Sequence, residues 1–116
     1  MKRGEIWTLH DARYASKARP VVIVQRDIAD FDSVIVCLLT SFNRQGAPSR
    51  VSLKPSPTNG LKKTSYVMAD KLLTVRQDEL GGKIGALTNE QVHAVSCSLA
   101  RVLAIGQSQA QPDPSD

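Results

Sequence analysis

The sequence has few of the residues that build metal sites, disulfide frameworks or membrane spans. Its two cysteines, Cys37 and Cys97, have no cysteine or histidine neighbours at metal-ligand spacing, so we expect reduced packing thiols in a cytoplasmic protein. No apolar run approaches the roughly 18 residues of a membrane span, and no apolar core follows the basic pair at residues 2–3, as a secretory signal would require. A glycine-rich phosphate loop and a His-Glu-x-x-His pattern are also missing. These absences disfavour membrane proteins and nucleotide-dependent or metal-dependent enzymes.

Aromatic residues are scarce, at 4% of the chain, whereas basic residues are in excess. The formal net charge is +4, and residues 1–63 alone hold 11 basic against 5 acidic side chains. Concentrated positive charge favours a polyanionic partner, either a nucleic acid or an acidic protein segment. The charge by itself also fits a solvated surface that has no partner.

Short apolar stretches separated by polar turns predict a β-rich domain. Strands are expected over residues 4–9, 20–25, 33–39 and 50–54, with two short pieces at 65–70 and 72–75. Asn59-Gly60 is a strong turn signal, because both residue types tolerate positive φ. Residues 77–80 suggest one helical turn, which Gly81-Gly82 would end.

The clearest helix begins after Thr88, which forms a capping box with Gln91. Gly106 suits a left-handed stop at its end. The apolar positions that recur on one face are Val92, Val95, Leu99, Val102 and Leu103. We predict one domain, residues 1–106, that is mainly β with α: a small antiparallel barrel with this C-terminal helix packed on it. Residues 107–116 are predicted to be a disordered polar tail.

Candidate functional side chains flank two neighbouring predicted strands. Arg19 comes immediately before the second strand, and Thr40-Ser41 comes immediately after the third. If these strands are adjacent, the guanidinium and the hydroxyls meet at one rim of the barrel, where they could hold a phosphodiester. RNA supplies its own nucleophile, the 2′-hydroxyl. A protein that cuts RNA therefore needs chiefly to stabilise the charged transition state, orient the attack and assist proton transfer.

Each candidate also has a purely structural interpretation. An arginine before a strand is often a solvated flank, and a Thr-Ser pair after a strand often binds its own backbone. Trp7, the only tryptophan, suits the core or an interface better than base stacking. Asp70 is either a turn acid in a surface ion pair or a carboxylate at the rim beside the arginine. His10 and His93 form no obvious acid–base couple.

The order of several short motifs resembles the MazF/PemK (Kid-like) toxin endoribonucleases over residues 2–105. The motifs are Arg3-Gly4-Glu5-Ile6-Trp7, Arg19-Pro20-Val21-Val22-Ile23-Val24, Leu39-Thr40-Ser41, Asn59-Gly60-Leu61, Ser65-Tyr66-Val67-Met68-Ala69-Asp70-Lys71, Thr74-Val75, Leu80-Gly81 and Ile84-Gly85.

The resemblance implies an SH3-like (CcdB/PemK-type) barrel that forms a homodimer and uses no cofactor or metal. It implies cleavage of single-stranded mRNA at a short sequence, which leaves 2′,3′-cyclic phosphate and 5′-hydroxyl ends. The family's functional arginine falls on Arg19 and its functional threonine on Thr40. Some members use an arginine at the position of Met68, so this chain favours the Arg19/Thr40 version. An acidic, MazE-like antitoxin is the implied protein partner, and one cationic groove would serve both partners.

Further RNA contacts are predicted from position and charge. Ser41 would orient the phosphate together with Thr40, and Glu5 and Asp70 are candidates at the rim. From charge alone, the RNA path is expected to follow Arg3, Arg13, Lys17, Arg44, Arg50 and Lys54.

Two other classes of function stay open. Non-catalytic poisons of DNA gyrase occur on the same barrel. They act through a C-terminal helix with a Trp-Gly-Ile-type tip, whereas this helix ends Leu103-Ala104-Ile105-Gly106. A barrel that only binds its partner, without catalysis, is the other class.

Overall fold

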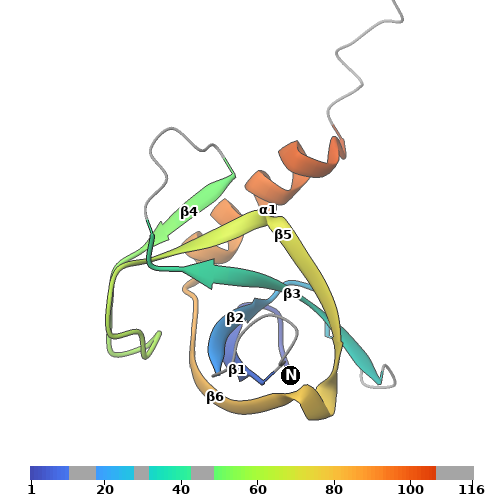
Figure 1. Cartoon of the computed structure of the whole chain (residues 1–116). Coiled ribbons are helices and arrows are strands. Elements are labelled where there is room, and N and C mark those ends of the chain that lie inside the picture. Colours follow the sequence, from blue (N-terminus) through green and yellow to red (C-terminus); the bar gives the residue numbers. More distant parts are fainter. Residues whose placement is uncertain (11–17, 28–31, 43–48, 107–116) are drawn as a thin grey trace, which may run out of the picture.

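In a computed structural model of the chain, the described residues form a strongly curved β-sheet and a helix that lies across its outside (Figure 1). The structure describes residues 1–10, 18–27, 32–42 and 49–106. The predicted tail at 107–116 lies outside this part. The elements are β1 (Glu5–Leu9), β2 (Arg19–Ile23), β3 (Ser33–Thr40), β4 (Arg50–Leu53), β5 (Ser65–Arg76), the 3-10 turn η1 (Gln77–Glu79), β6 (Leu80–Ala86) and α1 (Asn89–Leu103).

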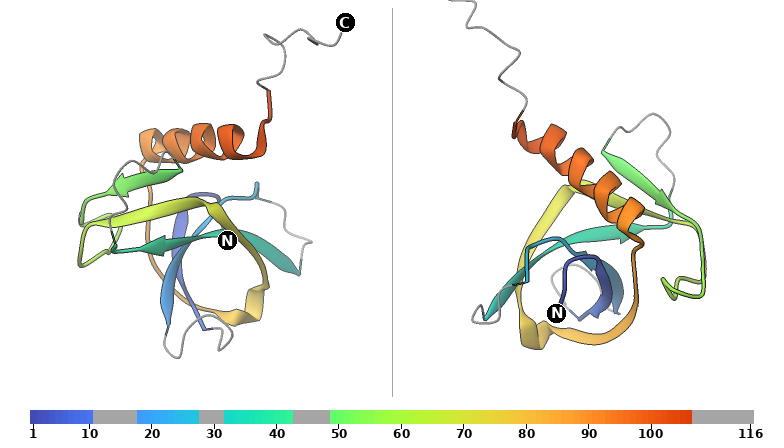
Figure 2. Two further views of the ribbon diagram at one scale, coloured as in Figure 1. Left: turned by 45° about the horizontal axis from the view of Figure 1, so that its top comes forward. Right: turned by 180° about the vertical axis from the view of Figure 1, so that it is seen from behind.

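All neighbouring strands in this sheet are antiparallel, in the order β4-β5-β3-β2-β1-β6. The long strand β5 bends away from β4, and the chain then turns through η1 into β6, which runs beside β1 (Figures 1 and 2). The sheet therefore coils into a small barrel, and the predicted fold class is confirmed.

The central strands β2 and β3 carry buried side chains on both faces, as their continuous apolar runs predict, although Ile35 of β3 is exposed. On β2, Val22 belongs to the core beneath α1, whereas Val21 and Ile23 belong to the barrel interior. On β3, Cys37 belongs to the core beneath α1 and Val36 to the barrel interior. Side chains alternate between the two faces of a strand, so the same two strands fill both cores.

Strand β5 is continuous, whereas the sequence pattern predicts two pieces. Its pairing with β3 shifts between Leu39–Val67 and Cys37–Leu72, so residues 68–71 are extra length opposite a single β3 residue. The polar side chains in this stretch look like a break in the sequence, but they lie on an irregularity within one strand.

Strand β6 is not predicted from the sequence, because Gly81 and Gly82 suggest the end of a helical turn. In the structure both glycines belong to the strand, which pairs with β1 through two register shifts. The backbone N–H of Gly82 also donates to the Thr8 hydroxyl at 2.9 Å. Glycines carry no side-chain pattern, so only the pairing partner reveals this strand.

The capping box of α1 is confirmed. The backbone N–H of Gln91 donates to Thr88 Oγ1 at 3.1 Å, and the Thr88 N–H donates to Gln91 Oε1 at 2.9 Å. The helix ends at Ala104, which is left-handed with φ 58°, and not at Gly106 as predicted. Val95 is buried, but the last two stripe positions, Val102 and Leu103, are exposed, so only part of the predicted stripe packs on the barrel. Within the described residues, no helix is long and apolar enough to cross a membrane.

Candidate active site

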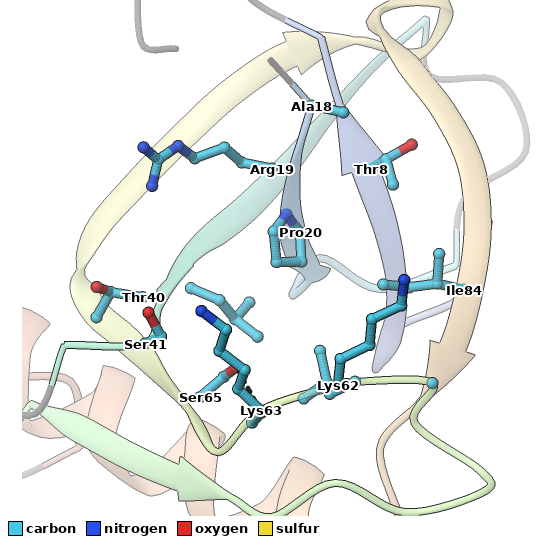
Figure 3. A pocket seen from close by; sticks show the side chains of 13 residues that line it. Thr8, Ala18, Arg19, Pro20, Thr40, Ser41, Lys62, Lys63, Ser65 and Ile84 are labelled. Carbon is cyan, nitrogen blue, oxygen red and sulfur yellow. Dashed lines mark hydrogen bonds between the residues drawn. The ribbon is translucent and has the colours of Figure 1, made fainter. Parts of the chain in front are cut away.

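A cleft of about 610 Å³ opens where β2 begins and β3 ends (Figure 3). Its wall is built by residues of β1, β2, β3, β5 and β6 together with the loop before β5. The polar side chains that line it are Thr8, Arg19, Thr40, Ser41, Lys62, Lys63 and Ser65. The apolar ones include Pro20, Leu39, Leu61 and Ile84. The lining within the described residues contains three cations and no carboxylate.

The register of the sheet brings Arg19 and Thr40 to the same rim. Paired positions of β2 and β3 run from Val21 with Leu38 to Ile23 with Val36. Continued by two residues, the same register sets Arg19 opposite Thr40. In Figure 3 the Arg19 guanidinium extends toward the side of the cleft where Thr40 and Ser41 lie. These three predicted site residues therefore share one cleft.

The Thr40 hydroxyl has a defined role in the turn that follows β3. Its Oγ1 accepts a hydrogen bond from the backbone N–H of Phe42 at 3.1 Å. A Thr-Ser pair after a strand is expected to bind its own backbone in this way. The contact uses the Thr40 oxygen only as an acceptor. A hydroxyl that accepts one bond still has its proton to donate. Thr40 can therefore hold the turn and donate to an anion in the cleft at the same time.

Two of the three cations in the cleft, Lys62 and Lys63, are absent from the RNA path expected from charge. They follow directly after the Asn59-Gly60 turn. A basic pair next to a strong turn signal at a barrel rim is the feature of the sequence that could have identified them. Neither lysine, nor Arg19, forms an ion pair with another residue that the structure describes.

Glu5 lies outside the cleft and is held in a network of its own. Its Oε1 accepts hydrogen bonds from the Trp7 indole at 2.9 Å and from the Lys2 N–H at 3.0 Å. Its Oε2 lies 3.1 Å from Lys83 Nζ. Burial alone would raise the pKa of this carboxyl, but the three donors outweigh it and lower the pKa to about 2. Glu5 thus joins β1 to β6, and Trp7 serves this network and the barrel core.

Asp70 is also outside the cleft lining, where it pairs with Arg50. Arg50 Nη1 lies 3.5 Å from Asp70 Oδ1, and the Ser49 hydroxyl donates to the same oxygen at 3.1 Å. Lys71 Nζ lies 4.0 Å from the other oxygen. Asp70 therefore forms an ion pair, as one of its two interpretations predicts, and its partner is Arg50 of β4.

Of the remaining predicted contacts, those that the structure describes lie outside the cleft lining. The Arg3 guanidinium donates to the Ser96 hydroxyl of α1 at 2.5 Å, and Lys54 is exposed and not part of the cleft lining. Arg13, Lys17 and Arg44 lie outside the described residues. The described members of the charge-based path do not line the cleft, because net charge does not reveal which cations neighbouring elements bring together.

Comparison with known proteins agrees with the fold. The family model of PemK-like, MazF-like toxins of type II toxin–antitoxin systems matches residues 2–103. The chain belongs to this family. A relative from Mycolicibacterium smegmatis, named "Probable endoribonuclease MazF", is 33% identical over 107 residues, which are 90% of this chain and 98% of that protein.

Solved structures of MazF toxins have the same fold. An endoribonuclease in complex with its cognate antitoxin, from a mycobacterial species, is similar with a TM-score of 0.76 and 28% identity over 90% of this chain and 96% of that one. The Mycobacterium tuberculosis toxin MazF-mt6 has a TM-score of 0.74 and 27% identity over 86% of this chain and 96% of that one. This MazF-like toxin is accordingly an endoribonuclease, and its cleft is the candidate active site.

Proposed function

We propose that this toxin cuts single-stranded mRNA, at a specific short sequence and without a metal ion, in the cleft between Arg19 and Thr40. The observation that supports this most is the composition of the lining. It combines a guanidinium, two lysines and several hydroxyls, and no carboxylate among the described residues. Such a surface suits a phosphodiester, because the three cations and the Thr40 hydroxyl can donate to phosphate oxygens.

The reaction proposed for this cleft is an in-line displacement at phosphorus. The RNA 2′-oxygen forms a bond to the phosphorus, and the bond from phosphorus to the 5′-oxygen breaks. The 2′-hydroxyl gives up a proton and the leaving 5′-oxygen gains one, so the products are a 2′,3′-cyclic phosphate and a 5′-hydroxyl. Negative charge grows on the non-bridging oxygens as the transition state forms.

Arg19 and Thr40 are the side chains assigned to that charge. The Arg19 guanidinium can donate two parallel N–H bonds to the non-bridging oxygens. The Thr40 hydroxyl, whose oxygen is already held by the Phe42 N–H, donates a further bond. Ser41 orients the same phosphate. Donors that are fixed in place before the reaction stabilise the developing charge without having to reorganise, and in many enzymes this effect supplies most of the rate enhancement.

The partners and setting follow from the same surface. We propose that a cognate antitoxin inhibits the toxin by laying an acidic segment over these cations. One cationic cleft would then bind two polyanions, the RNA and the antitoxin segment. A related mycobacterial endoribonuclease has been solved with its antitoxin. We further propose that the toxin works as a homodimer in the cytoplasm. Gyrase poisoning has no feature in its favour, because the chain's single tryptophan, Trp7, lies on β1 and not at the end of α1.

Incubation of the purified toxin with a long RNA in excess chelator tests the function. We expect discrete fragments with cyclic phosphate and 5′-hydroxyl ends. RNA that stays intact at stoichiometric folded toxin would contradict the proposal, and cutting that requires added metal would contradict its mechanism.

A further inference from the structure

The segment that carries Lys62 and Lys63 is held at both ends by polar side chains that are almost completely buried. Asn59, which is 0% exposed, accepts from the Leu61 N–H at 2.9 Å and from the Ser56 N–H at 3.0 Å, and donates to the Lys54 carbonyl at 2.8 Å. At the other end, the Ser65 hydroxyl donates to the Lys63 carbonyl at 3.1 Å. The backbone of the two lysines is therefore fixed from both sides.

The same turn is pressed against β6, backbone to backbone. A Cβ on Gly60 would overlap the Ile84 carbonyl oxygen, and one on Gly85 would overlap the Asn59 carbonyl. The Ala86 N–H also donates to the Thr58 carbonyl at 2.9 Å. Because β6 is paired with β1, this contact ties the turn to the barrel rather than leaving it as a free loop.

Figure 3 shows what this arrangement presents to the cleft. Both lysine side chains reach into it from the 60–63 segment, on the side opposite β2, where Arg19 enters. A volume of about 610 Å³ is within the range of pockets that hold a whole small-molecule ligand, so the cleft has room for more than one phosphate group.

We propose that Lys62 and Lys63 form a second phosphate clamp, which binds RNA backbone next to the phosphate held by Arg19, and that Asn59 and Ser65 are its positioning residues. A lysine ammonium is a compact charge on a flexible stem, which suits a phosphate oxygen. Fixing the backbone beneath such flexible side chains reduces the entropy lost when they bind. This assignment depends on the proposed RNA-cleaving function, because the clamp serves the same strand.

Binding to an RNA that cannot be cut isolates the clamp from catalysis. The probe is a mixed-sequence single-stranded oligonucleotide with 2′-O-methyl groups throughout, which leave no nucleophile. Its Kd is measured against salt concentration for the wild type and for the Lys62→Gln/Lys63→Gln double variant. Each lost phosphate contact should lower the log–log salt slope by about 0.7, so the double variant should lose about 1.4.

Lys54→Gln is the control, since it removes one lysine charge from the same loop. Lys54 accepts a hydrogen bond from Asn59 through its backbone carbonyl, and it is exposed and not part of the cleft lining. We expect its slope to equal that of the wild type. An unchanged slope for the double lysine variant, or a loss of about 0.7 with Lys54→Gln, would overturn the clamp.

Positioning is tested by coupling. Asn59→Ala and Ser65→Ala should each weaken probe binding in the wild-type background and have no effect once both lysines are glutamine, which a general loss of structure would not produce. Folding of each variant is checked by circular dichroism. If Asn59→Ala fails to fold, Ser65→Ala still tests the positioning role, because it removes only one hydrogen bond. Equal losses in both backgrounds would overturn the positioning role. Lysine-dependent binding by a wild type that never cuts RNA would instead overturn the proposed function alone.

Discussion

Arg19 and Thr40 lie at the same end of the β2–β3 ladder, Arg19 at the start of its strand and Thr40 at the end of its own. Antiparallel pairing makes these two chain positions neighbours although 20 residues separate them in the sequence. Both are at the mouth of the cleft, and Arg19 is exposed. Their side chains can therefore be changed with little effect on the cores.

Loss of either side chain should slow RNA cutting and spare the fold. We expect Arg19→Ala and Thr40→Val each to reduce the cleavage rate by about 10² to 10³, the usual effect of removing one transition-state donor. Thr40→Ser keeps the hydroxyl and serves as the control, with a much smaller loss. The rate is measured in single turnover on a long RNA, and unfolding in urea reports stability. Normal cutting by both variants would refute the site.

Acid should weaken the contribution of Glu5 to stability. The pKa of Glu5 is about 2 in the folded protein against an ordinary value of 4.5, so its ionised form is favoured by folding. The stabilisation is complete above about pH 4.5 and is lost as pH falls from there toward 2. Urea unfolding of the wild type and Glu5→Gln should differ most at neutral pH, and the difference should shrink in that acid range. A constant difference would contradict the network.

The two cysteines should react very differently with thiol reagents. Burial, reinforced by the negative charge of Asp70, raises the pKa of Cys37 to about 12, so its reactive thiolate is absent near neutral pH. Cys97 is exposed on α1. We expect one labelled thiol per native chain at pH 8 and two in denaturant, counted by mass spectrometry. Cys97→Ser should label only after unfolding; native labelling of that variant would show that Cys37 is accessible.

Two glycines of β6, Gly82 and Gly85, should tolerate replacement by alanine to different degrees. Gly85→Ala puts a methyl group against the Asn59 backbone, whereas Gly82→Ala meets no atom within 4 Å. We expect Gly85→Ala to lower the free energy of unfolding by about 1–3 kcal/mol, as overpacking does. Gly82→Ala should change it little. Equal urea midpoints for the two variants would mean that the turn does not press on β6.

Several elements can be predicted from local sequence because their cause is local. The Thr88–Gln91 capping box satisfies helix N–H groups within one turn, and the apolar runs of β2 and β3 are long enough to show burial on both faces. The Asn59-Gly60 turn is also local, because Gly60 has a φ of 68°, which a residue without a side chain adopts most easily. Strand β6 could not be predicted, because its glycine-rich stretch takes its conformation from pairing with β1.

The candidate site divides in the same way. Arg19, Thr40 and Ser41 could be found because each adjoins an apolar run whose ends the sequence marks. Glu5, Asp70 and Arg50 appeared equally suitable, but neighbouring strands supply Lys83 to Glu5 and pair Asp70 with Arg50. Lys62 and Lys63 are not identified from the sequence, because a count of charges does not show where each side chain points in the folded protein.

The sequence by itself determined the family, the strand-rich architecture and the position of the arginine–hydroxyl pair, because these depend on residue order and on periodicities of a few residues. Only the tertiary structure decided which charges face the cleft and which are neutralised by a partner. Electrostatic pairing acts between side chains that folding brings together, and nothing in local residue order specifies that distance.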